Sequence, residues 1–469
     1  MGADPRAPIP ALHHLLTSGT GAIRTRVAAI QLVAAILCLC SLAGCVSLTR
    51  VAPVHEKSSS GSNPVEPSVD CASPESANGG APYCRSPVIA SLSWDWNAGY
   101  HEGNGSDLWP VTWGRDGNVY AAFGDGGGFG GDDYRGRASF GIAMIAGTPP
   151  PNGATAHNVY GGYGSPHPAR IAGKAGSIIA VGASLYGIGR MYTTAEAALH
   201  PESLSGSPNR VQITYSKGNA YSWRTAPWTF CQADATGQAG LSGTFCPISF
   251  INYGPGNSGA PDGQIYILGF ANSTAYWSDA PGPVPAQTYL AKVPQHRLLS
   301  HAAYRYFAGL DAREQPVWSP DPRRMRPIFT DRNANRPGCG GMCRIASPLA
   351  EAVYDAGLAR YIGIAQGDFI GQTSFYDASA PWGPWRVIEY NTIDAATGTG
   401  GWGNLGTQAG VSLGVHPVNA WASADGLTLW LTYSSDGKAP AGASFPPAGT
   451  ALDSFNLVRV HLNLVTPER

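Results

Sequence analysis

The chain has 469 residues, of which only 13% are charged, and it contains 61 glycines and 38 prolines. A formal net charge of −1 offers no basic face of the kind that nucleic-acid binding needs. Sparse charge, abundant glycine and proline, and 10% aromatic residues favour many short strands with tight turns over long amphipathic helices. We therefore expect an all-β protein without a nucleic-acid partner.

The N-terminus has the pattern of an export signal. Arg24 and Arg26 precede an apolar run over 27–40, and the motif Leu-Ala-Gly-Cys follows at 42–45. This segment resembles a bacterial lipoprotein signal with its lipobox, and the run is too short for a comfortable transmembrane helix. An ordinary cleaved signal is the alternative. The sequence predicts a protein that is exported and anchored to the bacterial cell envelope through a lipid on Cys45.

Two further segments follow the signal at 1–45. Residues 46–88 are rich in Ser, Pro and Gly and lack periodicity, which predicts a flexible tether between the membrane and the folded part. Residues 89–465 are expected to form one folded domain, and we expect it to be a monomer.

Six cysteines outside the signal fall into three local pairs, namely Cys71 with Cys84, Cys231 with Cys246, and Cys339 with Cys343. An even number of cysteines in an exported chain indicates disulfides. The last pair has the spacing of half a zinc site, but no second Cys or His pair lies near it, so no metal is expected there.

The stretch 106–128 has the pattern of a β-hairpin, because apolar runs flank Asp116-Gly117. With a three-residue loop and Gly117 in the left-handed conformation, the opposed pairs are Trp113/Val119, Val111/Ala121, Trp109/Phe123 and Asp107/Asp125. Opposed Cβ atoms lie about 4.5–5.5 Å apart, and like charges at that spacing are destabilising, so the acid pair needs a functional reason. A two-residue loop would instead set Asp107 against Gly126. Two aspartates that cap strand ends are the structural alternative.

A pattern of a small turn followed by an apolar strand rich in Tyr and Trp recurs five times, with turn glycines at Gly117, Gly176, Gly263, Gly357 and Gly426. The intervals are irregular, and each is long enough for several strands. Five such units predict a five-bladed β-propeller, with an open β-sandwich as the alternative. The best helical segment, 296–307, is expected to be a short helix or turn that leads into a strand.

Polar residues recur nine positions before the turns, where the innermost strands of the blades should begin. Counting back gives Asp107, His167, Ser347 and His416, and Asn252 and Glu351 lie near the corresponding places. We expect His167, Asn252, Glu351 and His416 to bind substrate in one pocket with the acids. Trp109 and Trp421 supply indoles that could stack on a sugar ring. Each of the two histidines precedes a proline, which fits a structural role equally well.

Hydrolysis of a glycosidic bond usually needs two carboxyls, one protonated and one acting as nucleophile or base. Asp107 and Asp125 are expected to supply both, with Glu351 in reserve. A directly opposed pair would suit a retaining mechanism, which needs about 5–5.5 Å rather than about 6.5–9.5 Å. We favour Asp107 as nucleophile and Asp125 as acid/base, and we expect the glycines around Asp125 to let a ligand approach the backbone. The sequence has no nucleophile elbow, phosphate loop or zinc-protease motif, and we expect no cofactor.

The hairpin motifs, taken together, resemble the opening segment of a known family; they are Asp107, Trp109-Pro110, Trp113, Asp116-Gly117-Asn118, Tyr120 and Gly124-Asp125-Gly126. The family is that of the bacterial endo-D-arabinofuranases (D-arabinanases), formerly the domain of unknown function 4185 family, which cut the D-arabinan of mycobacterial arabinogalactan and lipoarabinomannan. The resemblance continues more weakly through 309–319 and 352–361 and covers most of 90–465. It implies a five-bladed propeller with an acid pair in the first blade and an arabinan-like polysaccharide as substrate. Only Asp107 and Asp125 lie in a motif that matches the family's functional residues.

Three functions follow as hypotheses. The first is a surface-anchored glycoside hydrolase that cleaves arabinofuranosyl linkages with Asp107 and Asp125. The second is a non-catalytic carbohydrate-binding propeller lipoprotein, and the third is a structural envelope lipoprotein without an acid-lined pocket.

Overall fold

The computed structural model describes residues 81–149, 153–192, 209–232, 245–271, 286–331, 348–366, 373–390, 393–394, 399–400, 411–436 and 453–466. Within these ranges the regular elements are β-strands and 3-10 helices, and none of the helices is long and apolar enough to cross a membrane. The predicted signal with Cys45, most of the tether, and Cys71, Cys339, Cys343 and Ser347 lie outside the described residues.

Five sheets of four or more strands form the blades of a propeller, as the sequence predicted. Blade 1 contains β2 (Val111–Trp113), β3 (Val119–Phe123), β4 (Gly141–Ala146) and β5 (Thr155–Tyr160). Blade 2 contains β6 (Gly173–Val181), β7 (Ser184–Met191) and β8 (Arg210–Ser216), and β8 also pairs with β9 (Trp223–Thr225) and β10 (Cys231–Gln232). Blade 3 contains β11 (Phe245–Phe250), β12 (Gln264–Ala271), β13 (Ala286–Pro294), β14 (Arg305–Leu310), β15 (Pro316–Ser319) and β16 (Pro327–Asp331).

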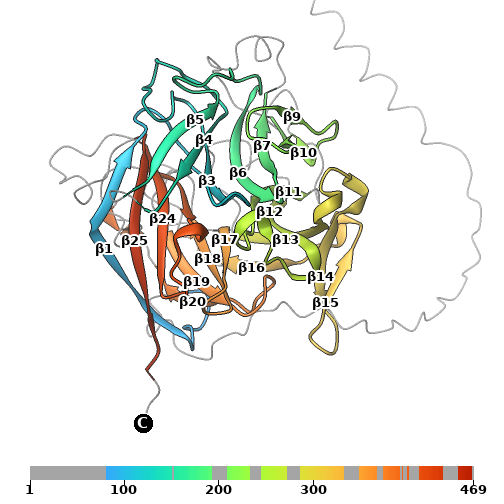
Figure 1. Cartoon of the computed structure of the whole chain (residues 1–469). Coiled ribbons are helices and arrows are strands. Elements are labelled where there is room, and N and C mark those ends of the chain that lie inside the picture. The colour runs from blue at the N-terminus through green and yellow to red at the C-terminus, as the bar shows by residue number, and fades with distance from the viewer. Residues whose placement is uncertain are drawn as a thin grey trace, which may run out of the picture. The chain divides into compact units, whose positions relative to one another are not determined.

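Blade 4 contains β17 (Leu349–Asp355), β18 (Arg360–Gln366), β19 (Thr373–Ala378) and β20 (Arg386–Glu389). Blade 5 contains β23 (Val411–Pro417), β24 (Thr428–Asp436), β25 (Phe455–Leu464) and β1 (Ile89–Glu102). A separate two-stranded ribbon is formed by β21 (Ile393–Asp394) and β22 (Thr399–Gly400). Figure 1 shows the blades following one another around a common centre in chain order.

The first and last strands of the domain close the ring. β1 is the outermost strand of blade 5 and pairs antiparallel with β25, so that Ile89 lies opposite Leu464. The N-terminal and C-terminal ends of the domain are therefore held by one sheet.

The last residues of the predicted tether pack onto the propeller. Tyr83 is buried among residues of blades 3 and 4, and its hydroxyl accepts a hydrogen bond from the backbone N–H of Thr330 at 2.6 Å. Arg85 forms a parallel bridge with Val387 of β20. The composition of 81–88 did not reveal these contacts, because each depends on a partner hundreds of residues or several blades away.

The first strand of each blade faces the centre. Contacts run from β2 to β6, from β6 to β11, from β11 to β17 and from β17 to β23, while blade 5 returns to blade 1 through a hydrogen bond from Thr432 Oγ1 to the Trp109 carbonyl. The main apolar clusters lie between successive blades, where the alternating side chains of two sheet faces meet. These inner strands therefore bring together residues that lie far apart in the sequence.

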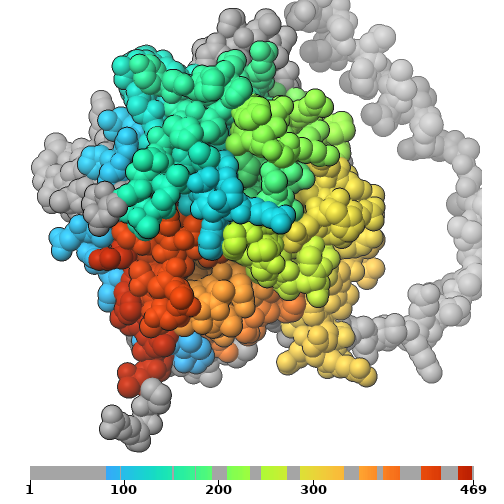
Figure 2. All heavy atoms as spheres, viewed as in Figure 1, coloured from blue at the N-terminus to red at the C-terminus, as the bar shows by residue number. Residues whose placement is uncertain are grey.

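We call the end of the inner strands near Gly117 the turn end, and the end near Asp107 the open end. At the turn end, a Cβ placed on Gly256 would lie 3.0 Å from both the Arg115 Cβ and the Gly182 carbonyl oxygen. Figure 2 shows the β2–β3 residues, in blue, at the centre of one face, next to the yellow-green residues of blade 3. Blades 1, 2 and 3 thus pack together at the turn end.

Four of the five predicted turns connect strands at the turn end, but the one at Gly176 does not. Gly176 lies inside β6, where the pairing with β7 shifts register between Ala175 and Ser177. The actual turn follows Val181, which pairs with Ser184, and it contains Gly182 at φ 58°. A glycine inside a strand often marks a bulge, and here the bulge has the same local sequence as a turn.

The segment 296–307 forms two 3-10 helices, Gln295–Arg297 and His301–Ala303, and then enters β14. This agrees with the expectation of a short helix or turn that leads into a strand.

Candidate active site at the open end of the first hairpin

The first hairpin has the predicted register near its turn and loses it at the open end. Val111 pairs with Ala121 and Trp113 with Val119, and Gly117 has φ 87° in the loop. Asp107, however, pairs with Gly124, since its N–H donates to the Gly124 carbonyl at 3.0 Å and its carbonyl accepts from the Gly124 N–H at 3.2 Å. Asp107 therefore faces neither Asp125 nor Gly126, the two partners that the sequence allowed.

Left-handed backbone at non-glycine residues causes this shift. Leu108 has φ 76° and Trp109 has φ 52°, and Asp125 on the facing segment has φ 56°. Such conformations cost on the order of 1–3 kcal/mol each and persist only where the surrounding structure fixes them, often at functional sites. The strain brings Asp107 beside the residue that precedes Asp125.

The Asp125 carboxylate is held by two cations. Lys174 on β6 forms an ion pair with Asp125 Oδ2, and Arg137 Nη2 lies 3.8 Å from Asp125 Oδ1. Arg137 also donates hydrogen bonds to the backbone carbonyls of Asp125 and Asp133. The Asp125 side chain is 24% exposed and that of Lys174 is 27% exposed, so the pair is sheltered but remains within reach of solvent.

Lys174 links the two acids electrostatically. Burial alone would lower the pKa of Lys174, but the charges of Asp125 and Asp107 outweigh it and leave that pKa raised above its ordinary 10.5. Both carboxylates therefore lie within Coulombic range of one ammonium group. This lysine explains how two like charges on adjacent segments are tolerated.

A third acid lies deeper, between blades 4 and 5. Glu351 on β17 and His416 on β23 are both buried, and His416 Nδ1 lies 2.8 Å from Glu351 Oε2. Glu351 Oε1 accepts a hydrogen bond from the Ala352 N–H at 3.2 Å. Burial raises the pKa of Glu351, although the hydrogen bond from His416 acts in the opposite direction.

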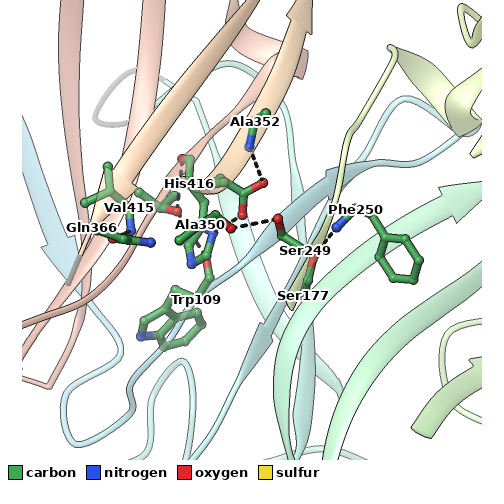
Figure 3. A network of polar contacts seen from close by, with 11 residues as sticks. Trp109, Ser177, Ser249, Phe250, Ala350, Ala352, Gln366, Val415 and His416 are labelled. Atoms are coloured by element: carbon green, nitrogen blue, oxygen red, sulfur yellow. Dashed lines mark hydrogen bonds and ion pairs between the residues drawn. The ribbon is translucent and has the colours of Figure 1, made fainter. Parts of the chain in front are cut away.

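The Glu351–His416 pair adjoins the segment that carries Asp107. A Cβ placed on Gly414 would lie 2.5 Å from His416 Nε2 and 3.2 Å from the Leu108 carbonyl oxygen. Figure 3 shows His416 close to Ala350 and Val415, with Trp109 nearby and the Ser249–Ala350 and Ser177–Phe250 hydrogen bonds to one side. The Glu351–His416 pair therefore lies next to the segment that follows Asp107.

Asn252 lies at the turn end instead. Its Oδ1 accepts a hydrogen bond from Thr112 Oγ1 at 2.7 Å, and its carbonyl accepts one from the Tyr354 N–H at 3.1 Å. Thr112 Oγ1 in turn accepts from the Ala180 N–H at 2.9 Å. The hydrogen bonds of Asn252 and Thr112 therefore join blades 1, 2, 3 and 4 at the turn end, away from the Asp107 and Asp125 segments.

His167 lies outside the inner strands. It precedes β6, is half-buried, and stacks on Tyr221 with ring centroids 4.2 Å apart. The count that placed it at the start of an inner strand was wrong, because Gly176 is a bulge residue and not a turn residue.

Trp109 is a core residue. Its side chain has no exposed surface and packs against Phe123, Phe129 and Phe455, and its indole N–H donates to the Ser106 carbonyl at 2.9 Å. Trp421 is also buried. The indole of Trp109 is therefore not placed to stack on a sugar, contrary to the expectation.

The glycines after Asp125 make room for the protein's own backbone. A Cβ on Gly126 would collide with the Gly105 carbonyl, and one on Gly127 would collide with the Arg135 carbonyl. The expectation that they admit a ligand is therefore wrong for these two positions.

The disulfide Cys231–Cys246 is present, with a Cα–Cα distance of 5.4 Å, and it joins β10 to β11. Cys84 is disulfide-bonded as well, while its predicted partner Cys71 lies outside the described residues.

Sequence reasoning missed Lys174, although this residue left a signal. It is the one charged residue in the apolar stretch 171–189, and a lysine in a half-buried strand usually has a partner. That partner, Asp125, lies in another blade and could not be named from the pattern. Among the described residues, no group of three or more His, Cys, Asp or Glu side chains is arranged to hold a metal ion.

Comparison with protein-family models and with curated proteins gives no match. The fold is similar to that of several solved structures at low identity. A thermostable family-43 glycoside hydrolase is 12% identical, with a TM-score of 0.38, over 79% of this chain and 93% of that one. The family 117 glycoside hydrolase Zg3597 from Zobellia galactanivorans is 10% identical, with a TM-score of 0.35, over 80% and 91%. The alpha-L-arabinofuranosidase PaAbf62A from Podospora anserina is 12% identical, with a TM-score of 0.34, over 82% and 94%. The assignment of an activity must therefore rest on the side chains of this chain.

Proposed function

We propose that this protein is a glycoside hydrolase that cleaves arabinofuranosyl linkages of the D-arabinan type. The observation that carries the proposal is the acid cluster at the open end of the first hairpin. Asp107 and Asp125 lie on adjacent segments, the backbone is left-handed at Asp125 and just after Asp107, and one ammonium group interacts with both carboxyls. Paired carboxyls of this kind are what glycosidic hydrolysis requires.

The contacts suggest different roles for the two aspartates. Lys174 and Arg137 fix the position of the Asp125 carboxylate, so we assign Asp125 as the nucleophile or base. Asp107 is then the acid that protonates the leaving oxygen. These roles are the reverse of those that the sequence alone favoured, in which Asp107 was the nucleophile and Asp125 the acid/base.

For a retaining reaction, an Asp125 oxygen bonds to the anomeric carbon while the bond to the leaving oxygen breaks, and the proton of Asp107 goes to that oxygen. Water, deprotonated by Asp107, then displaces Asp125 from the sugar.

His416 is suited to binding a sugar hydroxyl. Its Nδ1 is held by Glu351, and its Nε2 lies beside Gly414, which also adjoins the Leu108 carbonyl next to Asp107. A carboxylate on one ring nitrogen fixes the orientation of an imidazole and leaves the other nitrogen for a ligand. Glu351 would then be a positioning residue that also remains a reserve acid.

The arabinan part of the proposal is supported by the likeness of the hairpin motifs to the endo-D-arabinofuranase family. The cell-envelope part is supported by the signal and lipobox, which predict a lipid anchor on Cys45. Both acids come from one chain, so a monomer suffices for the reaction.

The proposal is tested by incubating the purified full chain with mycobacterial arabinogalactan, α-L-arabinan and a non-furanoside control such as xylan. Release of arabinose oligosaccharides from the first polymer alone is the expected result. Binding without release would favour a carbohydrate-binding protein, and neither binding nor release would reject a glycan ligand of these classes.

The roles of the acids are tested by azide rescue of Asp107→Gly and Asp125→Gly with an activated aryl arabinofuranoside. If Asp125 is the nucleophile, azide takes its place in the second variant and gives a glycosyl azide of inverted configuration. The same product from the Asp107 variant would show instead that Asp107 is the nucleophile, as the sequence alone favoured.

A further inference from the structure

Tyr192 is a buried tyrosine whose hydroxyl has no hydrogen-bond partner among the described residues. It follows directly after β7, where its N–H donates to the Ala172 carbonyl at 3.1 Å. Its side chain is 7% exposed, and in the part of the chain that the structure describes its hydroxyl oxygen is buried without a hydrogen-bond partner. Buried side-chain hydroxyls are normally paired, so this one needs an explanation.

The strand register places Tyr192 beside the acid cluster. Lys174 lies opposite Arg190 in the β6–β7 ladder, and side chains alternate along a strand. Tyr192 is two residues beyond Arg190, so it shares the face of Lys174 as a diagonal neighbour, within reach of a long side chain. Lys174 extends from that face to Asp125 in blade 1.

The electrostatics agree with this placement. Burial raises the pKa of the Tyr192 phenol, and the charges of Lys174, Asp125, Arg190 and Asp107 all act on it. The group is therefore a neutral donor at physiological pH. Lys174 already pairs with Asp125, whereas the Tyr192 hydroxyl makes no hydrogen bond within the part of the chain that the structure describes.

We propose that the Tyr192 hydroxyl binds a hydroxyl group of the sugar that lies between Asp107 and Asp125. This rests on the proposed function, because it takes a saccharide as the ligand. A sugar hydroxyl both donates and accepts, as a phenol does, so it satisfies the buried group without adding charge. Tyr192 is thus a substrate-binding residue contributed by blade 2 to a site whose acids come from blade 1.

The test is Tyr192→Phe, which removes only the oxygen, measured with arabinogalactan fragments in the full chain. We expect kcat/KM to fall by about tenfold to a hundredfold, the loss expected for one hydrogen bond to a bound ligand. We also expect the melting temperature to stay the same or rise, because an unpaired buried hydroxyl is removed. A purely structural tyrosine would change stability and leave kcat/KM unaltered.

Tyr304→Phe is the matched control. The Tyr304 hydroxyl is also buried but donates to the Leu298 carbonyl at 2.7 Å in blade 3. This variant should melt at a lower temperature and keep its kinetics.

Binding separates this inference from the proposed function. Affinity for an arabinan oligosaccharide is measured by calorimetry with Tyr192→Phe and the unaltered chain. Weaker binding by the variant supports the inference even if no glycan is cleaved, in which case only the hydrolase assignment fails. Affinity and kcat/KM within twofold of the unaltered chain would overturn the role of Tyr192.

Discussion

The two ends of the first hairpin are built in opposite ways. At the turn end, Thr112, Asn252 and Ala180 satisfy one another's hydrogen bonds across three blades. At the open end, Asp107 and Asp125 place two carboxyl groups on adjacent segments, with left-handed backbone at Leu108, Trp109 and Asp125.

This difference separates what stabilises the propeller from what it is built to do. Neutral hydrogen bonds between buried groups make a modest net contribution each, but the loss of one partner leaves the other buried and unsatisfied. Charges and strain at the open end cost stability, so they are expected where function requires them. The same short hairpin thus serves the fold at one end and the chemistry at the other, and variants at the two ends should fail in different ways.

The largest effect is expected from Asp107→Asn. The substitution keeps the size of the side chain, and the contacts of Asp107 with Gly124 are made by the backbone, so the fold should be retained. Loss of a catalytic acid should lower kcat by about 10²–10⁴-fold. Steady-state kinetics on arabinogalactan, with a thermal melt as control, measure this; a kcat within tenfold of the unaltered chain would remove Asp107 from the reaction.

Lys174→Met should have the next largest effect. It keeps most of the aliphatic stem but removes the charge that pairs with Asp125 and interacts with Asp107. We expect kcat/KM to fall by about 10- to 100-fold, because the two carboxyl groups lose the cation that orients them and offsets their mutual repulsion. Lys174→Arg should recover part of the loss if charge is what matters, and equal loss in both variants would point to shape instead.

Thr112→Val removes hydrogen bonds at the turn end, so it should affect stability where the two variants at the open end affect catalysis. The Ala180 N–H and the Asn252 amide would lose their partner in a buried region. We expect about 1–3 kcal/mol of lost stability in urea unfolding, with kcat/KM unchanged in the folded protein. A large kinetic defect without loss of stability would contradict the division between the two ends.

The smallest expected effect concerns how the stability of the fold depends on pH through Glu351. Because burial raises the pKa of Glu351 above its ordinary 4.5, the folded state favours the neutral acid, and stability falls as the pH rises from below 4.5 through the folded pKa. Glu351→Gln removes this dependence, so its melting temperature should exceed that of the unaltered chain near neutral pH and approach it below pH 4. The reverse trend would mean that the ionised pair with His416 stabilises the fold.

Local patterns predicted what local chemistry determines. Asp116-Gly117 fixed the loop and hence the pairing of Trp113 with Val119, and the spacing of Cys231 and Cys246 indicated their disulfide. The same turn pattern, repeated along the chain, gave the propeller and its blade number. It failed at Gly176, because a bulge glycine and a turn glycine look alike in sequence.

The rest of the site depends on contacts between blades. Nothing in the sequence marks Leu108 and Trp109 as left-handed, since bulky residues rarely adopt that conformation, and so the shift of Asp107 to Gly124 was not foreseen. Trp109 was expected to stack on sugar because aromatic residues are common in sugar sites, but its neighbours bury it completely. The ion pair of Lys174 with Asp125 likewise joins two blades and cannot be read from either alone.

The central claim, that the open end is a hydrolytic site, is tested most directly by measuring binding and cleavage side by side. The unaltered chain and Asp107→Asn are each given the same mycobacterial D-arabinan, with affinity measured by calorimetry and new reducing ends measured over time. We predict similar affinities and release by the unaltered chain only. Similar affinities with no release by either protein would contradict a hydrolase and leave a carbohydrate-binding propeller.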